Sequence, residues 1–398
     1  MKLVKLSLVA ALAAGALATS ASAMPLEEAI KGVDVSGMTR IRYKATNVKK
    51  DKAETTHESE WKFKAVMNVK TTIDDNFFNV VSIRYDSTND GIGHSTANND
   101  GNHKFEANQF FLGATFGNTT IQLGRQTISA FFTDDMYGDG IKVLNTDVEG
   151  LVLAALFMDS LEKDKDIKSL SAGHVNNKLV TDHNLYGVAA IGSYDPISFQ
   201  LWYASLEDVT NLFALELAGD FAISDDVKLG LKGQYAFSDF DGKFKTGSGN
   251  TVDDGSFWAV EASSEFFGVD FSAGYIDFST KENRASLNSF EDQGSFISPG
   301  EELLDNYSLY SGKNRYYFIT AGYTIPDSGV RLGVDWVDGS NKVNGIKTDK
   351  SEVVARVDYK YNEKLSFETW YSHVDEKKKV ADSSNKADAF RFQAKYSF

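Results

Sequence analysis

The chain has 398 residues, no cysteine, 13% aromatic residues and a formal net charge of −15. The lack of cysteine excludes disulfides, and the acidic balance argues against nucleic acid as a partner. After residue 23, no stretch approaches the roughly 18 uninterrupted apolar residues of a membrane-spanning helix, so a helical membrane protein is excluded.

The first 23 residues have the pattern of a secretory signal peptide. Lys2 and Lys5 precede an apolar run, and Ala21-Ser22-Ala23 forms an A-x-A cleavage site. We therefore expect residues 1–23 to be removed on export. Residues 24–33 are expected to form a short periplasmic stub. No linker or composition break divides residues 24–398, so we predict one domain.

Apolar and polar residues then alternate along the chain, as they do in strands with two different faces. In the first predicted strand, Ile41 and Tyr43 alternate with Arg40 and Arg42. The final segment, Phe390–Phe398, alternates completely, with aromatic residues and one alanine on one face and polar residues on the other. A soluble sheet with one buried face would show the same pattern, but usually with fewer strands.

Turn-forming segments divide these strands into hairpins. Eight segments are short, so nine up-down hairpins and 18 strands follow. The short segments are Ile73–Asn76, Gly117-Asn118, Asp147–Gly150, Asp195–Ile197, Ser224–Asp226, Phe267-Gly268, Pro326–Gly329 and Asn362-Glu363. The long polar segments are Ser87–His103, Leu161–His183, Asp239–Ser256, Ser279–Lys313, Asp338–Lys350 and Asp375–Asn385. The prediction is an all-β, 18-stranded antiparallel transmembrane β-barrel with short periplasmic turns and long extracellular loops.

Several motifs resemble the major outer membrane protein family of Campylobacter, and the resemblance runs the whole chain. They include PLEEAIKGVDVSG at Pro25–Gly37, DGIKVLN at Asp139–Asn145, EDQG at Glu291–Gly294 and EVVARVDYKYNEKLSF at Glu352–Phe367. The resemblance implies a homotrimeric porin of the Gram-negative outer membrane that prefers cations. It also implies contact with lipopolysaccharide, recognition of Phe398 by the barrel-assembly machinery, and a third loop folded into the lumen.

A porin needs a wet lumen and a charged constriction rather than reaction chemistry, and no catalytic motif is present. We therefore expect passive diffusion of small hydrophilic solutes and ions through a water-filled channel, not an enzyme. The inward parity of the first strands carries a basic cluster, for which an ordinary solvated lining is the alternative. The cluster consists of Arg40, Arg42, Lys62, Lys64 and Arg84. Arg125 breaks the parity, and a bulge or the end of the wall there would turn it inward.

The third loop is predicted at Thr127–Asp139. Its carboxylates, Asp134, Asp135 and Asp139, are expected to face the basic cluster across the constriction, and Phe131-Phe132 to pack the loop on the wall. Aspartate is also a common turn former, which explains these residues without any role in selectivity.

No cofactor is required, although the resemblance implies a possible calcium ion. Carboxylates are the hard ligands that calcium prefers. The candidates carried over are Asp135, Asp139, Asp166 and Glu291. Solvated loop acids are an equally good interpretation of these four residues.

Two alternative functions stay open. One is a substrate-specific channel, and the other is a surface adhesin that binds the host through its loops, Ser279–Lys313 above all. The run Leu151–Met158 is apolar on both parities. A neighbouring subunit, an inward loop or a locally dry lumen would each explain it.

Overall fold

The alternating segments of the sequence become one closed antiparallel sheet of 18 strands. The computed structural model describes residues 32–51, 54–88, 104–162, 174–175, 178–224, 227–379 and 383–398. Each barrel strand pairs with the barrel strands before and after it, and β1 pairs with β22 to close the ring. The predicted signal peptide, most of the predicted stub and Asp166 lie outside the described residues.

The barrel strands keep the order of the chain. They are β1 Val33–Lys50, β2 Thr56–Thr72, β3 Phe77–Thr88, β4 Lys104–Phe116, β5 Thr119–Thr127, β6 Tyr137–Asn145, β7 Leu151–Leu161, β10 Leu185–Tyr194, β11 Ile197–Leu206, β12 Thr210–Ser224, β13 Val227–Phe240, β14 Gly255–Phe266, β15 Val269–Thr280, β18 Lys313–Thr324, β19 Val330–Val343, β20 Ile346–Lys360, β21 Leu365–Lys378 and β22 Ser383–Ser397.

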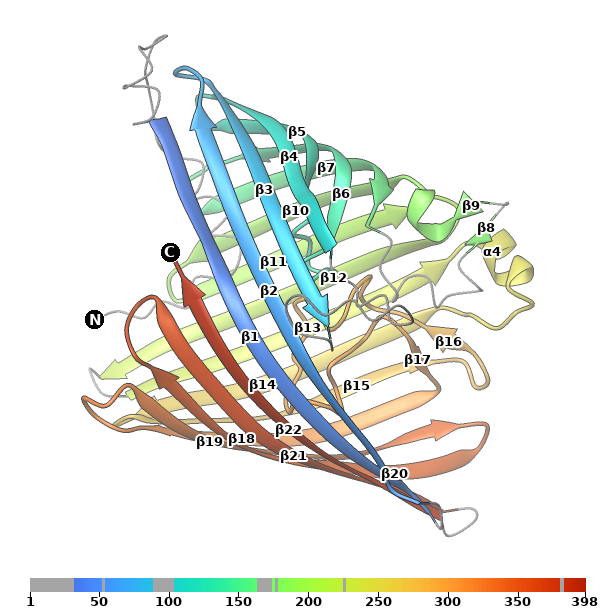
Figure 1. Cartoon of the computed structure of the whole chain (residues 1–398). Coiled ribbons are helices and arrows are strands. Elements are labelled where there is room, and N and C mark those ends of the chain that lie inside the picture. Colours follow the sequence, from blue (N-terminus) through green and yellow to red (C-terminus); the bar gives the residue numbers. More distant parts are fainter. Residues whose placement is uncertain are drawn as a thin grey trace, which may run out of the picture.

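Small elements lie at the end of the barrel opposite the C-terminus (Figure 1). They are β8 His174–Val175, β9 Lys178–Leu179, the 3-10 helix η3 Val180–Asp182, the helix α4 Gly242–Gly247, β16 Ala285–Ser286 and β17 Tyr310–Ser311. No helix among the described residues combines the length and the apolarity that crossing a membrane would need.

The last strand closes the barrel. Figure 1 shows β22, in red, beside β1, in blue, and their register pairs Tyr43 with Phe392. The backbone N–H of Gly37 donates to the carbonyl of Phe398 at 2.9 Å, and Phe398 N–H donates back at 3.0 Å. The predicted alternation of this strand is confirmed, because Phe390 and Tyr396 are exposed on the outer face.

The outer face of the barrel is apolar and exposed all the way round. Leu201, Leu231, Trp258, Ile319 and Trp336 are examples, each 41–59% exposed. Apolar side chains arranged in a continuous outward band need an apolar surrounding, and a closed barrel leaves no unpaired strand edge to meet it. The outer face is therefore built to contact lipid.

The predicted division into short and long connections is confirmed at the short-turn end and corrected at the other end. All eight predicted short turns join strands that end within a few residues of them. The predicted long loop Asp338–Lys350 is instead a two-residue hairpin, because Asn344 and Gly345 both adopt positive φ, of 52° and 77°, and let β19 and β20 continue. The predicted loop Asp375–Asn385 is also largely strand, in β21 and β22.

Candidate functional site

The predicted basic cluster lies on the inner face of β1, β2 and β3. The register places Arg40 opposite Lys64 and Arg42 opposite Lys62. Ile41, between the two arginines, is 43% exposed on the outer face, so the arginines point into the lumen. Arg84 joins them from β3 and is held by Asp86 at 2.7 Å and Glu162 at 2.8 Å.

The predicted third loop does fold into the lumen, over residues 128–136. Ile128, Phe131, Phe132 and Met136 are all buried, with 0–1% of their surface exposed. A loop with this many apolar side chains gains more by packing on the barrel wall than by standing in water. Its apolar side chains therefore explain why loop 128–136 turns inward, as predicted.

Two acids of loop 128–136 face the basic cluster. Lys64 Nζ lies 2.7 Å from Asp135 Oδ2. Burial disfavours the charged form of Asp135, but the charge and hydrogen bond of Lys64 outweigh it and lower the pKa of this carboxyl. Burial and the neighbouring Asp135 raise the pKa of Asp134. Asp134 lines the main cavity.

Arg125 and Asp139 lie elsewhere than in the predicted constriction. The ladder between β5 and β6 runs through them without a shift, so the bulge that would turn Arg125 inward is not formed. Arg125 keeps the parity of Leu123, which is 55% exposed on the outer face. It pairs with Asp139 across the ladder at 3.1 Å, and Ser160 donates to Asp139 at 2.7 Å. Asp139 belongs to β6, because this strand begins at Tyr137.

A second loop, which the sequence analysis assigned to the surface, also enters the lumen. This loop 281–312 joins β15 to β18, and Figure 1 shows part of it, in orange, inside the ring of strands. Phe290 N–H donates to the carbonyl of Phe132 at 2.6 Å, and Ser295 N–H to that of Phe131 at 2.8 Å. The rings of Phe131 and Phe296 lie 4.9 Å apart. The two inward loops therefore pack as one unit.

A buried carboxylate fixes the far end of loop 281–312 to the opposite wall. Glu352 of β20 is fully buried and accepts backbone N–H bonds from Glu301, Glu302 and Leu303 at 3.0–3.1 Å. The Ser372 hydroxyl donates to the same carboxylate at 2.7 Å. Several donors aimed at one carboxylate form a strong anchor, because charge-assisted hydrogen bonds are about twice as strong as neutral ones.

The anchored segment presents acids to a row of wall cations. Glu301 lies 2.7 Å from Arg356 and 3.4 Å from Arg391, and Glu302 lies 2.6 Å from Lys44. Burial raises the pKa of Glu301, although the two arginines oppose this. Burial and, after it, the Glu302 carboxylate raise the pKa of Asp305 to about 6.

The two loops and the charged wall enclose a cavity of about 910 Å³. Ten acidic and seven basic side chains line it. The basic ones are Arg42, Lys44, Lys62, Lys232, Arg331, Arg356 and Arg391. The seven cations all lie on strands, whereas the acids come in equal number from strands and from the two loops. The cavity is therefore lined by charges of both signs, and the loops supply five of its ten acids.

The sequence analysis missed Arg331, Arg356 and Arg391. Arg356 and Arg391 lie on the inward parity of β20 and β22, and the alternation of apolar and polar residues in the sequence indicates this orientation. It also missed the inward course of loop 281–312, for which the signal was its apolar content. Leu287, Phe290 and Tyr307 are fully buried.

The predicted calcium ligands are only partly brought together. The Asp135 and Glu291 side chains are in hydrogen-bonding contact, and Glu291 also accepts the N–H of Asp134 at 3.1 Å. Asp139 lies on β6, paired with Arg125. Within the described ranges, no three carboxylate or imidazole groups are grouped as a metal site.

Solved structures of similar fold are outer-membrane channels. OccAB3 from Acinetobacter baumannii has a TM-score of 0.71 at 14% identity, covering 92% of this chain and 99% of that one. OpdL from Pseudomonas aeruginosa gives 0.70 at 13%, covering 92% and 99%. OccK2 (OpdF) from the same organism, solved in complex with glucuronate, gives 0.68 at 11%, covering 92% and 98%.

The fold and the family agree. Curated proteins gave no match. At these low identities the solved structures show the fold alone, a closed barrel of the outer-membrane channel type. The model of the Campylobacter major outer membrane protein family, in contrast, matches residues 1–398, the whole chain. The protein is therefore an outer-membrane porin, and it belongs to the Campylobacter major outer membrane protein family.

Proposed function

We propose that this porin conducts small hydrophilic solutes and ions by passive diffusion, with a preference for cations, and that loops 128–136 and 281–312 together form its constriction. The observation that carries the proposal is the 910 Å³ cavity between these loops and the charged wall. Charged side chains at a narrow point favour polar solutes, because an apolar solute gains nothing in exchange for displacing their water.

The charge balance of the cavity supports the preference for cations. Its ten acids and seven bases leave a formal excess of three negative charges. Most of the basic groups lie close to carboxylates, as Arg356 does to Glu301 at 2.7 Å, so their positive charge is largely offset. A cation entering the passage therefore meets a net attractive potential.

The test is the reversal potential across a planar bilayer in asymmetric KCl. The wild-type channel should give a cation-directed potential. A double variant, Asp134→Asn with Asp135→Asn, should reduce it, because it removes two acids and leaves Lys64 without its partner. Asp139→Asn is the matched control, since this acid shares the outward parity of β6 and should leave the potential unchanged. A potential directed to anions, or an equal effect of the control, would contradict the proposal.

A substrate-specific channel is the second candidate. The observation that favours it is the state of Arg42. Its Nε and Nη2 atoms donate to the Gln393 amide oxygen at 3.0 and 2.7 Å. Among the described residues, no carboxylate lies within ion-pair distance of Arg42. Such a group suits a solute carboxylate. Glucuronate, the ligand in the OccK2 structure, is a direct probe. Saturable current block that Arg42→Gln removes would establish this candidate.

The surface adhesin has less support, because the loop that suggested it, residues 279–313, is largely packed inside the barrel. From the family we also propose a homotrimer, contact with lipopolysaccharide, recognition of Phe398 by the assembly machinery, and cleavage after Ala23. Chemical cross-linking of the outer membrane tests the trimer, and the mass of the purified chain tests the cleavage.

Calcium binding is a separate proposal. Asp135 and Glu291 supply two carboxylates in contact, and a site would need further ligands from elsewhere. Its test is the melting temperature of the folded porin with calcium and with chelator. An equal value in both would count against it.

A further inference from the structure

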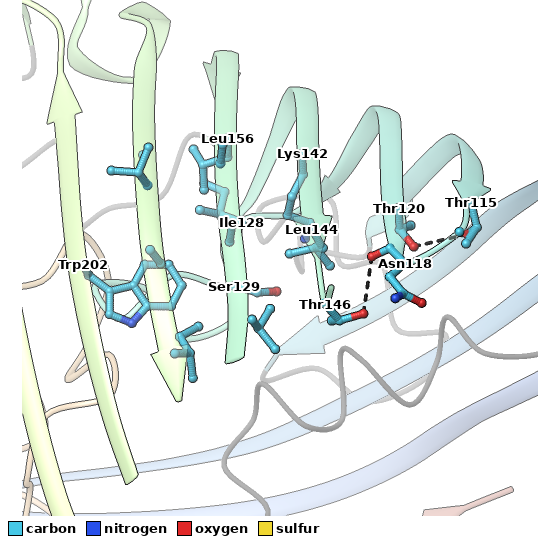
Figure 2. A pocket seen from close by; sticks show the side chains of 18 residues that line it. Thr115, Asn118, Thr120, Ile128, Ser129, Lys142, Leu144, Thr146, Leu156 and Trp202 are labelled. Atoms are coloured by element: carbon cyan, nitrogen blue, oxygen red, sulfur yellow. Dashed lines mark hydrogen bonds between the residues drawn. The ribbon is translucent and has the colours of Figure 1, made fainter. Parts of the chain in front are cut away.

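A small pocket lies on the inner wall beside loop 128–136 (Figure 2), and it shares no lining residue with the main cavity. It has a volume of about 70 Å³. Its walls are mostly apolar and come from β6, β7, β10 and β11, with Ile128 and Ser129 from the loop. The apolar residues are Ile128, Leu144, Val152, Ala154, Leu156, Ala189, Ile191 and Trp202.

Small residues create the space. Ala154, Gly187 and Ala189 stand on the inward parity of β7 and β10, where larger side chains would fill the pocket. A Cβ atom added to Gly187 would lie 3.0 Å from Leu156 Cγ. These residues belong in part to the Leu151–Met158 run. Its inner parity therefore faces the packed loop, which is one of the explanations left open above, and also borders this apolar pocket.

One charged group lines this pocket. Lys142 of β6 is 4% exposed, and its Nζ donates to the carbonyl of Thr127 at 2.8 Å. A protonated lysine has three donors, and among the described residues this is the one hydrogen bond of its ammonium group. No described carboxylate lies within ion-pair distance of it. A buried cation without a counter-ion is costly, so the site is complementary to an anion.

The rim of the pocket is polar and close to the short-turn end of the barrel. Asn118 and Thr146 lie in the turns after β4 and β6, and Thr146 Oγ1 donates to the carbonyl of Asn118 at 3.3 Å. The Thr115 and Thr120 hydroxyls are 3.2 Å apart. A solute would meet this rim first and reach the apolar part behind it.

We propose that this pocket binds a small organic monoanion with an apolar body, namely a monocarboxylate that carries a short alkyl chain, because about 70 Å³ is too small for an aromatic ring. Its carboxylate accepts hydrogen bonds from Lys142, and its apolar part packs on Ile128, Leu156 and Trp202. A polyhydroxylated anion is disfavoured, because the apolar lining leaves its hydroxyl groups without partners. The inference rests on the proposed channel only for access to the lumen.

The experiment is isothermal titration calorimetry of the folded, detergent-solubilised porin with propionate. Propionamide, which has nearly the same shape and no charge, is the matched ligand. We expect saturable propionate binding and much weaker propionamide binding. Lys142→Met, which has a side chain of similar length without the charge, should weaken propionate binding about tenfold or more. Lys232→Met, at a lysine of the main cavity, should leave it unchanged.

A second variant keeps the lysine and removes the space. Ala189→Leu should abolish propionate binding while the heat-modifiable migration of the folded barrel on gels is retained. The inference is overturned if the wild type shows no saturable binding, if Lys142→Met binds as well as the wild type, or if propionamide binds equally. Conductance of the same preparations distinguishes a failure of the pocket from a failure of the proposed channel. A conducting channel without propionate binding refutes the pocket alone, and binding without conductance refutes the proposed channel.

Discussion

Two walls of the same lumen, built from the same alternating strands, have opposite chemistry. The inner face of β1 and β20 carries Arg40, Arg42 and Arg356, whereas the inner face of β7 and β10 carries Ala154 and Ile191. The difference follows what each wall contacts. The charged wall borders a wet cavity, and the apolar wall is covered by loop 128–136. Strand parity thus predicts which side chains face inward. Whether these side chains are charged or apolar follows from what they contact, water in the cavity or a packed loop.

Loop 281–312 connects the two walls. Its Phe290 and Phe296 pack on the aromatic residues of loop 128–136, while Glu301 and Glu302 meet the cations of the opposite wall. Substitutions that loosen either the apolar end or the charged end of this loop should therefore widen the same constriction. The size of the effect on conductance should differ between the two ends.

The largest effect is expected from the apolar end. Phe132→Ala removes a fully buried ring that contacts Phe290 at 6.1 Å between centroids, and should cost about 3–5 kcal/mol of local stability. Both inward loops should then loosen, so single-channel conductance and current noise should rise. Phe267→Ala, at a turn residue that is 76% exposed, is the control. Unchanged conductance in the Phe132 variant would show that the loops do not limit the passage.

A smaller effect is expected at the charged end. Glu352→Gln leaves the backbone donors of Glu301, Glu302 and Leu303 with a weaker, partly mismatched partner, at a cost of about 2–3 kcal/mol. The loop should leave the charged wall for part of the time. Recordings should show brief transitions to a higher conductance, which Glu363→Gln, at a side chain 85% exposed, should not produce. Traces of Glu352→Gln as steady as those of the wild type would argue that Glu352 is not the anchor.

Alanine substitutions at two glycines distinguish the effect of backbone strain from the effect of displacing loop 281–312. Gly300 and Gly345 both have positive φ, of 84° and 77°, so alanine costs about 1–2 kcal/mol at either place. A Cβ at Gly300 would lie 2.3 Å from Glu352 Oε2, whereas one at Gly345 meets nothing within 4 Å. Gly300→Ala should change conductance, and Gly345→Ala should not. Equal conductance in the two variants would contradict this.

The smallest effect is a dependence of selectivity on pH. The pKa of Asp305 is raised to about 6, above its ordinary range, so this acid is charged at pH 7.5 and loses its charge as the pH falls through about 6. The preference for cations should therefore weaken between pH 7.5 and pH 5.5, as reversal potentials would measure. Asp305→Asn should flatten part of this change. Asp327→Asn, in a short turn, serves as control and should retain the full pH response.

The strands and turns were predictable because they depend on local pattern. Alternation predicted the closing strand at Phe390–Phe398, and Asp, Asn, Gly and Pro marked the short turns. The Asn344-Gly345 pair was also a local signal for a tight hairpin, but the polar residues around it outweighed that signal in the prediction of a long loop. A polar strand beyond the apolar band has the composition of a loop.

The site was predictable only in part, because the course of a loop is set by packing at long range. The wall cations of β1 to β3 and the aspartates of loop 128–136 were found by parity and by the family resemblance. The contacts of Glu352 with Glu301 and Leu303 join residues far apart in the sequence, and no local pattern indicates them. Parity alone placed Arg125 on the outer face, and the unbroken ladder between β5 and β6 keeps it there, so the predicted inward turn was wrong.

The inward course of loop 281–312 also affects how the porin presents itself to its surroundings. Most residues of this segment are buried or half-buried, so it offers little surface to antibodies or proteases. Substitutions in this segment would therefore change the filling of the lumen more than they would change the outer surface of the barrel.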